Sequence, residues 1–125
     1  MNGYTTITLN GQQVGIKFAY PAIKWFTEES IKKNDLFFVQ GENGEDSSGF
    51  TVEGFAKLIQ CSYKNNCLLK EVEPVFTYED FYNYVEASQD TEQGQIELTR
   101  IAESYAESSV MKKIIEGQKK SQVSL

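Results

Sequence analysis

The chain has no histidine among its 125 residues, and this absence removes a large part of enzyme chemistry. A histidine general base, a Ser-His-Asp triad and a histidine-ligated metal site all require an imidazole ring. Cysteine is scarce too, because Cys61 and Cys67 are the only two. Two thiols without histidine supply too few ligands for a tetrahedral zinc site. We therefore expect free, buried thiols, no metal site and no cofactor.

Long hydrophobic runs are also missing. No run of about 18 apolar residues occurs, so we expect no transmembrane helix and no membrane contact. The N-terminal stretch MNGYTTITLNG lacks the basic start and the apolar core of a signal peptide. These absences predict a cytoplasmic protein.

Basic residues are outnumbered, with 12 Lys and Arg against 18 Asp and Glu, for a formal net charge of −6. A negative domain repels the phosphate backbone, so we expect no nucleic-acid partner. The acidic pairs Glu28-Glu29 and Glu45-Asp46 fall on segments expected to be exposed, where adjacent carboxylates are common. No glycine-rich phosphate loop of standard spacing occurs either. These features together predict a protein that is not an enzyme.

The apolar content that is present suffices for one folded domain. Hydrophobic residues make up 40% of the chain and aromatic residues 13%. A domain of this length buries roughly two-thirds of the surface that its unfolded chain exposes. We expect a single domain over residues 1–117 and a flexible polar tail over residues 118–125.

The segment YTTITLNGQQVGIKF predicts a β-hairpin over residues 4–18. Asn10-Gly11 suits a two-residue type I′ turn, because both positions require a positive φ. The turn sets three facing pairs: Leu9 with Gln12, Ile7 with Val14, and Thr5 with Ile16. A hairpin alone is marginal in water, so its apolar face must pack on helices.

Apolar residues at helical spacing predict helices at about 21–33, 51–66, 77–88 and 93–116. Thr51 and Thr77 are suitable N-caps, and Asp80 completes an approximate capping box with Thr77. Gly54 would let another element approach the second helix closely. Asn65-Asn66 is a plausible end for that helix. The predicted fold is α+β and mainly α, with the N-terminal hairpin packed on a small bundle of about four helices.

Four aromatic rings fall in TYEDFYNYVEAS, residues 77–88. Three of these rings share a stripe with a valine, and the stripe comprises Tyr78, Phe81, Tyr82 and Val85. Tyr84 lies roughly 60° beyond Phe81 on the helix wheel. Amphipathic rings at the margin of a core are typical of protein interfaces, so Tyr82 and Tyr84 are candidate partner-binding residues.

The last segment contains two apolar sets that point in nearly opposite directions. The first set comprises Leu98, Ile101, Ala102 and Tyr105, and the second comprises Val110, Met111, Ile114 and Ile115. Either the helix breaks near Ser108-Ser109 and the chain folds back, or the second set lies in a groove of another chain. The second set therefore joins the candidate partner-binding residues.

The layout of the chain is distinctive: a short N-terminal hairpin leads into an aromatic helix, YPAIKWF, and two further helical segments follow. The second helix carries a T-x-E-x-x-A-x-L-I pattern at Thr51, Glu53, Ala56, Leu58 and Ile59, followed by Tyr63 and Asn65. The third helix carries a T-x-E-D-F pattern that ends in V-E, at Thr77, Glu79, Asp80, Phe81, Val85 and Glu86. Over roughly residues 4 to 88 this layout resembles the tail assembly chaperones of long-tailed bacteriophages and prophages.

The resemblance implies a non-enzymatic protein of the bacterial host cytoplasm. Such chaperones bind the tape measure protein, keep its hydrophobic helices soluble and help recruit tail tube subunits. Some are made in short and frameshifted long forms. Three alternatives stay open: a tail structural or completion protein, a bacterial antitoxin-like interaction domain, and a small enzyme with a deep pocket lined by Cys61 or by paired acids. Homo-oligomerisation also stays open.

Overall fold

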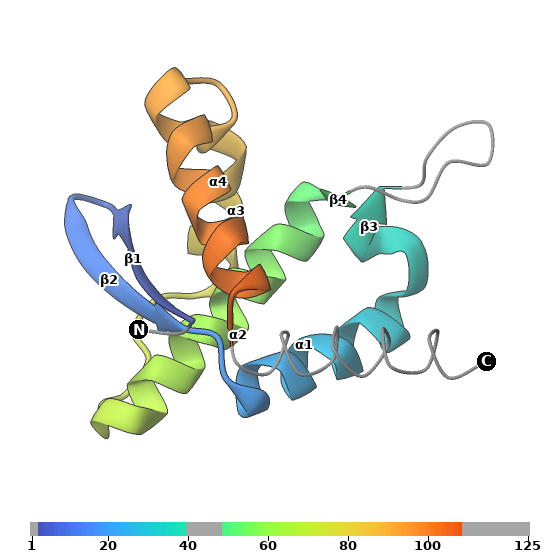
Figure 1. Ribbon diagram of the computed structural model, residues 1–125, viewed down its shortest axis with the longest axis vertical. Coiled ribbons are helices and arrows are strands. Elements are labelled where there is room, and N and C mark those ends of the chain that lie inside the picture. Colours follow the sequence, from blue (N-terminus) through green and yellow to red (C-terminus); the bar gives the residue numbers. More distant parts are fainter. Residues whose placement is uncertain (1–2, 40–48, 109–125) are drawn as a thin grey trace.

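An N-terminal hairpin is followed by four helices that pack together, which confirms the predicted fold class (Figure 1). The structure is a computed structural model that describes residues 3–39 and 49–108. The elements in chain order are β1 (Tyr4–Leu9), β2 (Gln12–Lys17), α1 (Tyr20–Lys33), the 3-10 helix η1 (Asn34–Phe37), β3 (Phe38–Val39), β4 (Gly49–Phe50), α2 (Val52–Lys70), α3 (Tyr78–Ser88) and α4 (Glu92–Ala106). No helix in the described ranges has both the length and the hydropathy that crossing a membrane requires.

The hairpin forms with the predicted turn and the predicted register. Asn10 has φ 51° and Gly11 has φ 79°, as a type I′ turn requires. Leu9 pairs with Gln12 and Ile7 with Val14 in the antiparallel ladder. The apolar face is buried and comprises Ile7, Leu9, Val14 and Ile16. The second strand pair, β3 with β4, is short and also antiparallel.

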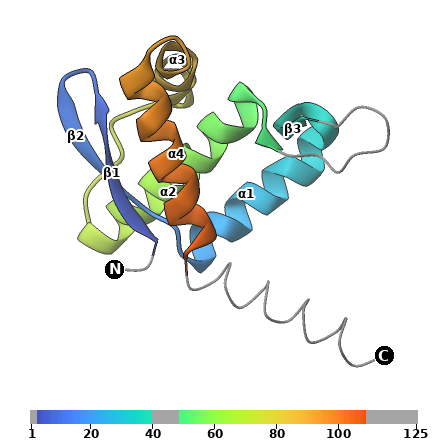
Figure 2. The ribbon, with the colours of Figure 1, turned by 45° about the horizontal axis from the view of Figure 1, so that its top comes forward.

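Helix α2 runs through the middle of the fold (Figures 1 and 2). It contacts α1, β2, α3, β4 and η1, so elements surround it on several sides. From Leu58 to Cys67 every residue except Lys64 is buried. Apolar residues at helical spacing predicted this helix, but its buried surface is wider than a single apolar stripe. Small and polar residues such as Ser62 are buried as well, because neighbouring elements also cover the polar face of the helical wheel.

The predicted end of this helix at Asn65-Asn66 is wrong, because α2 continues to Lys70. Asparagine often ends helices by bonding to its own local backbone. Here the Asn65 side chain is 1% exposed, and its Nδ2 donates to the Lys17 carbonyl of β2 at 3.1 Å. The helix instead ends where Glu71 adopts the left-handed conformation with φ 57°.

The N-terminus of α2 lies against η1, as the glycine at its first turn predicts. A Cβ added to Gly54 would lie 2.2 Å from the Phe37 carbonyl oxygen, so only glycine fits there. Thr51 caps the helix by accepting a hydrogen bond from the Gly54 N–H at 3.0 Å. Its own N–H donates to the Phe37 carbonyl at 3.1 Å. The capping residue and the glycine thus dock α2 onto η1.

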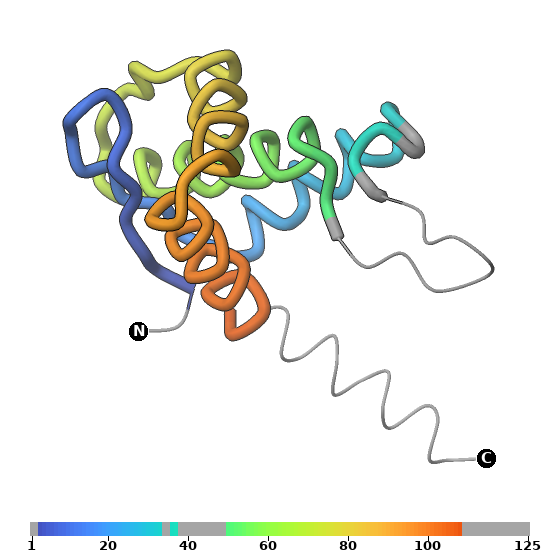
Figure 3. Tube along the Cα trace, turned by 90° about the horizontal axis from the view of Figure 1, so that it is seen from above, coloured from blue at the N-terminus to red at the C-terminus, as the bar shows by residue number. Residues whose placement is uncertain are grey.

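Helices α3 and α4 form an antiparallel pair beside the hairpin, and Figure 3 shows α4 next to β1. The capping box of Thr77 and Asp80 is present, and Phe81 and Val85 are buried as predicted. Helix α4 ends at Ala106, earlier than the predicted range 93–116. The predicted tail 118–125 lies outside the described residues.

The Asn65 contact yields a test of how α2 holds the hairpin. We expect Asn65→Ala to lower the free energy of unfolding by about 1–3 kcal/mol, because a buried hydrogen bond between α2 and β2 is lost. Lys64→Ala, on the exposed side of the same helix, should change it by less than about 0.5 kcal/mol. Urea unfolding followed by circular dichroism measures both. Equal stability of the two variants would contradict this role of Asn65.

Candidate functional site

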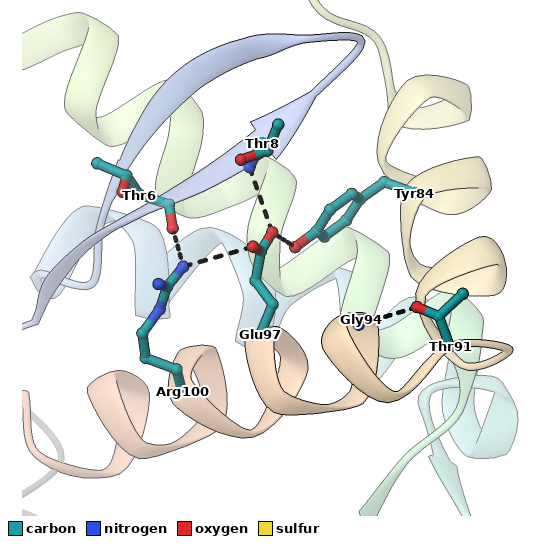
Figure 4. Close-up of polar contacts among 7 residues, drawn as sticks. All are labelled: Thr6, Thr8, Tyr84, Thr91, Gly94, Glu97 and Arg100. Atoms are coloured by element: carbon teal, nitrogen blue, oxygen red, sulfur yellow. Dashed lines mark hydrogen bonds and ion pairs between the residues drawn. The ribbon is translucent and has the colours of Figure 1, made fainter.

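A network of polar side chains joins α3, α4 and β1 around Glu97 (Figure 4). The Glu97 carboxylate accepts hydrogen bonds from the Tyr84 hydroxyl and, at 3.2 Å, from the Thr8 backbone N–H. Arg100 lies one turn further along α4, with its Nη2 3.9 Å from Glu97 Oε2. The same guanidinium donates to the Thr6 carbonyl. Glu97 and Arg100 thus occupy positions that a third strand would take, and α4 closes the outer edge of β1.

The candidate residue Tyr84 is part of this network. Burial raises the pKa of its phenol, and the hydrogen bond to Glu97 and the charge of that carboxylate raise it further. Tyr84 therefore has a structural task that the helix wheel did not indicate. Tyr82 packs elsewhere, with its ring centroid 6.2 Å from that of Tyr78. The role of both tyrosines in partner binding stays a prediction.

The other candidate residues come from the C-terminal segment. Val110, Met111, Ile114 and Ile115 lie outside the described residues. Their predicted contact with another chain therefore stays a prediction.

Both cysteines are free and buried, which confirms the prediction for these thiols. Burial raises the pKa of the Cys61 thiol to about 11, against the opposing effect of Lys57 and Lys64. A nucleophilic or metal-binding cysteine needs the thiolate, which a raised pKa disfavours. Within the described ranges, no three His, Cys, Asp or Glu side chains are close enough to hold a metal ion.

A groove runs between α1 and α2, and we call it the Trp25 groove. One part has a volume of about 350 Å³ and is lined by Trp25, Glu28, Glu29, Lys57, Gln60, Cys61 and Lys64. A neighbouring part of about 280 Å³ is lined by Trp25, Lys64, Cys67, Leu68, Val72, Glu73 and Pro74. The two parts share Trp25 and Lys64, so they adjoin each other. The lining includes Cys61 and an acidic pair, as the small-enzyme alternative required, but the protonated thiol does not suit nucleophilic chemistry.

Four large apolar side chains are exposed within residues 68–75, which we call the apolar segment, and two of them, Leu68 and Val72, line the second part of the groove. Leu68 is 62% exposed, Leu69 63%, Val72 56% and Val75 74%. Single exposed apolar residues are ordinary on a protein surface, whereas a cluster marks an interaction site. The apolar segment is thus the strongest candidate site in the part of the chain that the structure describes.

The buried residue Tyr63 holds the backbone of this segment. Its hydroxyl oxygen accepts hydrogen bonds from the Val75 N–H at 2.8 Å and the Phe76 N–H at 3.4 Å. The Phe76 ring packs on Tyr63, with their centroids 5.7 Å apart. At the other end, the Val72 N–H donates to the Cys67 carbonyl at 3.0 Å. The exposed side chains are therefore presented by backbone that is bonded at both ends.

No site was predicted in LLKEVEPVF, residues 68–76, which lies between the second and third predicted helices. Leu68 and Leu69 follow the predicted helix end, and Val72 and Val75 flank the helix-breaking Pro74. The available signal was four large apolar residues within eight positions, three of them at helical spacing, in a stretch where Pro74 prevents a continuous helix.

Comparison of the chain with models of protein families, with curated protein sequences and with solved structures gave no match. The site is therefore argued from its own geometry.

The polar network yields a paired test on two tyrosines of α3. We expect Tyr84→Phe to lower the free energy of unfolding by about 1–2 kcal/mol, because a hydrogen bond to a charged, part-buried acceptor is lost. Tyr82→Phe is the matched control, because no hydrogen bond of its hydroxyl is recorded within the described ranges, and it should stay within about 0.5 kcal/mol of the parent. Thermal and urea unfolding measure both. If Tyr84→Phe were as stable as Tyr82→Phe, the network would not hold α3 to α4.

Proposed function

We propose that this protein is a non-enzymatic binding protein that shields hydrophobic helical segments of a partner. The partner that the family resemblance implies is the tape measure protein of a phage or prophage tail, with tail tube subunits as a second partner. The observation that carries the proposal is the apolar segment, whose four large side chains are exposed on a backbone held by Tyr63.

The geometry of the apolar segment suits transient binding. A backbone that is already hydrogen-bonded loses little conformational entropy when a partner covers its side chains. The adjoining Trp25 groove offers a part-buried tryptophan, the residue type most enriched in interface hot spots. A formal charge of −6 would also keep a complex with a hydrophobic partner soluble.

The chemistry of the groove supports a binding role over a catalytic one. Two buried thiols, Cys61 and Cys67, line the groove, and burial favours the protonated form of the Cys61 thiol. No histidine exists in the sequence to deprotonate it. Glu28 and Glu29 lie on the α1 side of the groove.

Co-expression with the tape measure protein encoded in the same genome tests the proposal. We expect this chain to raise the soluble fraction of that protein and to co-purify with it. Replacing Val72 and Val75 by Asp should abolish both effects without changing the melting temperature, because both side chains are exposed. Ile96→Asp is the matched control, since Ile96 is an equally exposed apolar residue on α4, 56% accessible. A tape measure protein that is fully soluble alone and does not associate would refute the proposed function.

A further inference from the structure

The two walls of the Trp25 groove carry charges of opposite sign. Glu28 and Glu29 line it from α1, whereas Lys57 and Lys64 line it from α2. Within the described ranges the one recorded ion pair is between Arg100 and Glu97, so no pair neutralises the walls across the groove. An acidic wall thus faces a basic wall.

The basic wall is partly held in place. Lys57 Nζ donates to Gln60 Oε1 at 2.9 Å and lies 4.7 Å from the centroid of the Tyr78 ring. Neither partner is an anion, so the positive charge of Lys57 is not neutralised. Lys64 lies about two turns further along α2 and is exposed. Both cations are therefore available to an acidic group on an occupant.

Trp25, Gln60 and Cys61 line the groove between the charged walls, and the adjoining part adds the apolar side chains of Leu68 and Val72. From Lys57 to Leu68, α2 rises about 17 Å, which matches about three turns of a second helix. Both walls are helices, whose backbone groups are already bonded internally. An extended occupant would find no backbone partners there, whereas a helix satisfies its own.

We infer that the Trp25 groove binds one amphipathic α-helix whose apolar ridge is flanked by acidic residues on one side and by basic residues on the other. Acids on the occupant face Lys57 and Lys64, and bases face Glu28 and Glu29. Turning the helix end for end would place each flank against like charge, so the charge split also sets the direction of the bound helix. This inference rests on the proposed function, which gives the class of partner as a hydrophobic helical segment. It adds the charge pattern of that segment and the place where the segment binds.

Trp25 is the only tryptophan of the chain and lies in the groove, so its fluorescence reports occupancy directly. The probes are three tryptophan-free helical peptides with one apolar ridge and different flanks: acidic on one side and basic on the other, acidic on both, or basic on both. We expect the split peptide to shift the Trp25 emission and to bind about tenfold more tightly than the other two at low salt. The difference should shrink in 1 M salt, where the Debye length is about 3 Å.

Charge reversal supplies the matched variants. Lys57→Glu combined with Lys64→Glu should transfer the preference to the peptide with two basic flanks. Lys64→Glu alone, at an exposed position, keeps the test valid if the double variant does not fold, and should move the preference in the same direction. Lys70→Glu is the control, because this exposed lysine of α2 does not line either part of the groove. Equal affinity for all three peptides, or an unchanged Trp25 emission with each, would overturn the inference.

The outcomes separate this inference from the proposed function. Suppose that the tape measure protein co-purifies, but that Lys64→Glu does not change its binding and its binding does not shift the Trp25 emission. The groove inference then fails and the proposed function stands. If the split peptide binds selectively but the tape measure protein does not associate, the groove inference stands and the function fails.

Discussion

The burial of α2 on nearly all sides is the constraint on which the rest of the structure depends. Between Leu58 and Cys67 only Lys64 faces solvent, so each face of the helix serves a different neighbour. Asn65 binds the hairpin, and Tyr63 binds the backbone that leads to α3. The remaining face forms one wall of the Trp25 groove. The candidate site is thus built by the same helix that organises the core.

The fold covers both edges of the hairpin but leaves the side chains of the apolar segment exposed. Side chains of α4 cover the outer edge of β1, and Asn65 bonds to β2 at the other edge of the hairpin. The aromatic rings of α3 pack against the core, and the Tyr84 hydroxyl also donates a hydrogen bond to Glu97. The chain nevertheless leaves Val72 and Val75 in solvent, on backbone that is hydrogen-bonded. Covered hairpin edges beside an exposed apolar segment are features that suit a binding protein.

Local signals predicted the elements, and tertiary contacts decided the rest. The hairpin was predictable because the Asn10-Gly11 turn and the period-2 alternation agree on one register, and the capping residues Thr51 and Thr77 marked where two helices begin. The continuation of α2 through Asn65 was not predictable, since it depends on a carbonyl of β2. The groove was equally out of reach, because it needs α1 and α2 to lie side by side. The count of aromatic rings drew attention to Tyr84, whereas the exposed apolar segment consists of aliphatic residues on either side of a helix end.

Tyr63 holds the backbone of the apolar segment by two hydrogen bonds, and amide hydrogen exchange measures how firmly. We expect the Val75 and Phe76 amides to exchange far more slowly than the neighbouring Glu73 amide, although all three lie outside helices. Tyr63→Phe should remove this protection at Val75 and Phe76 while leaving the amide of buried Ile59 in α2 slow. Exchange of the Val75 and Phe76 amides at the rate of an unfolded peptide in the parent protein would contradict the account.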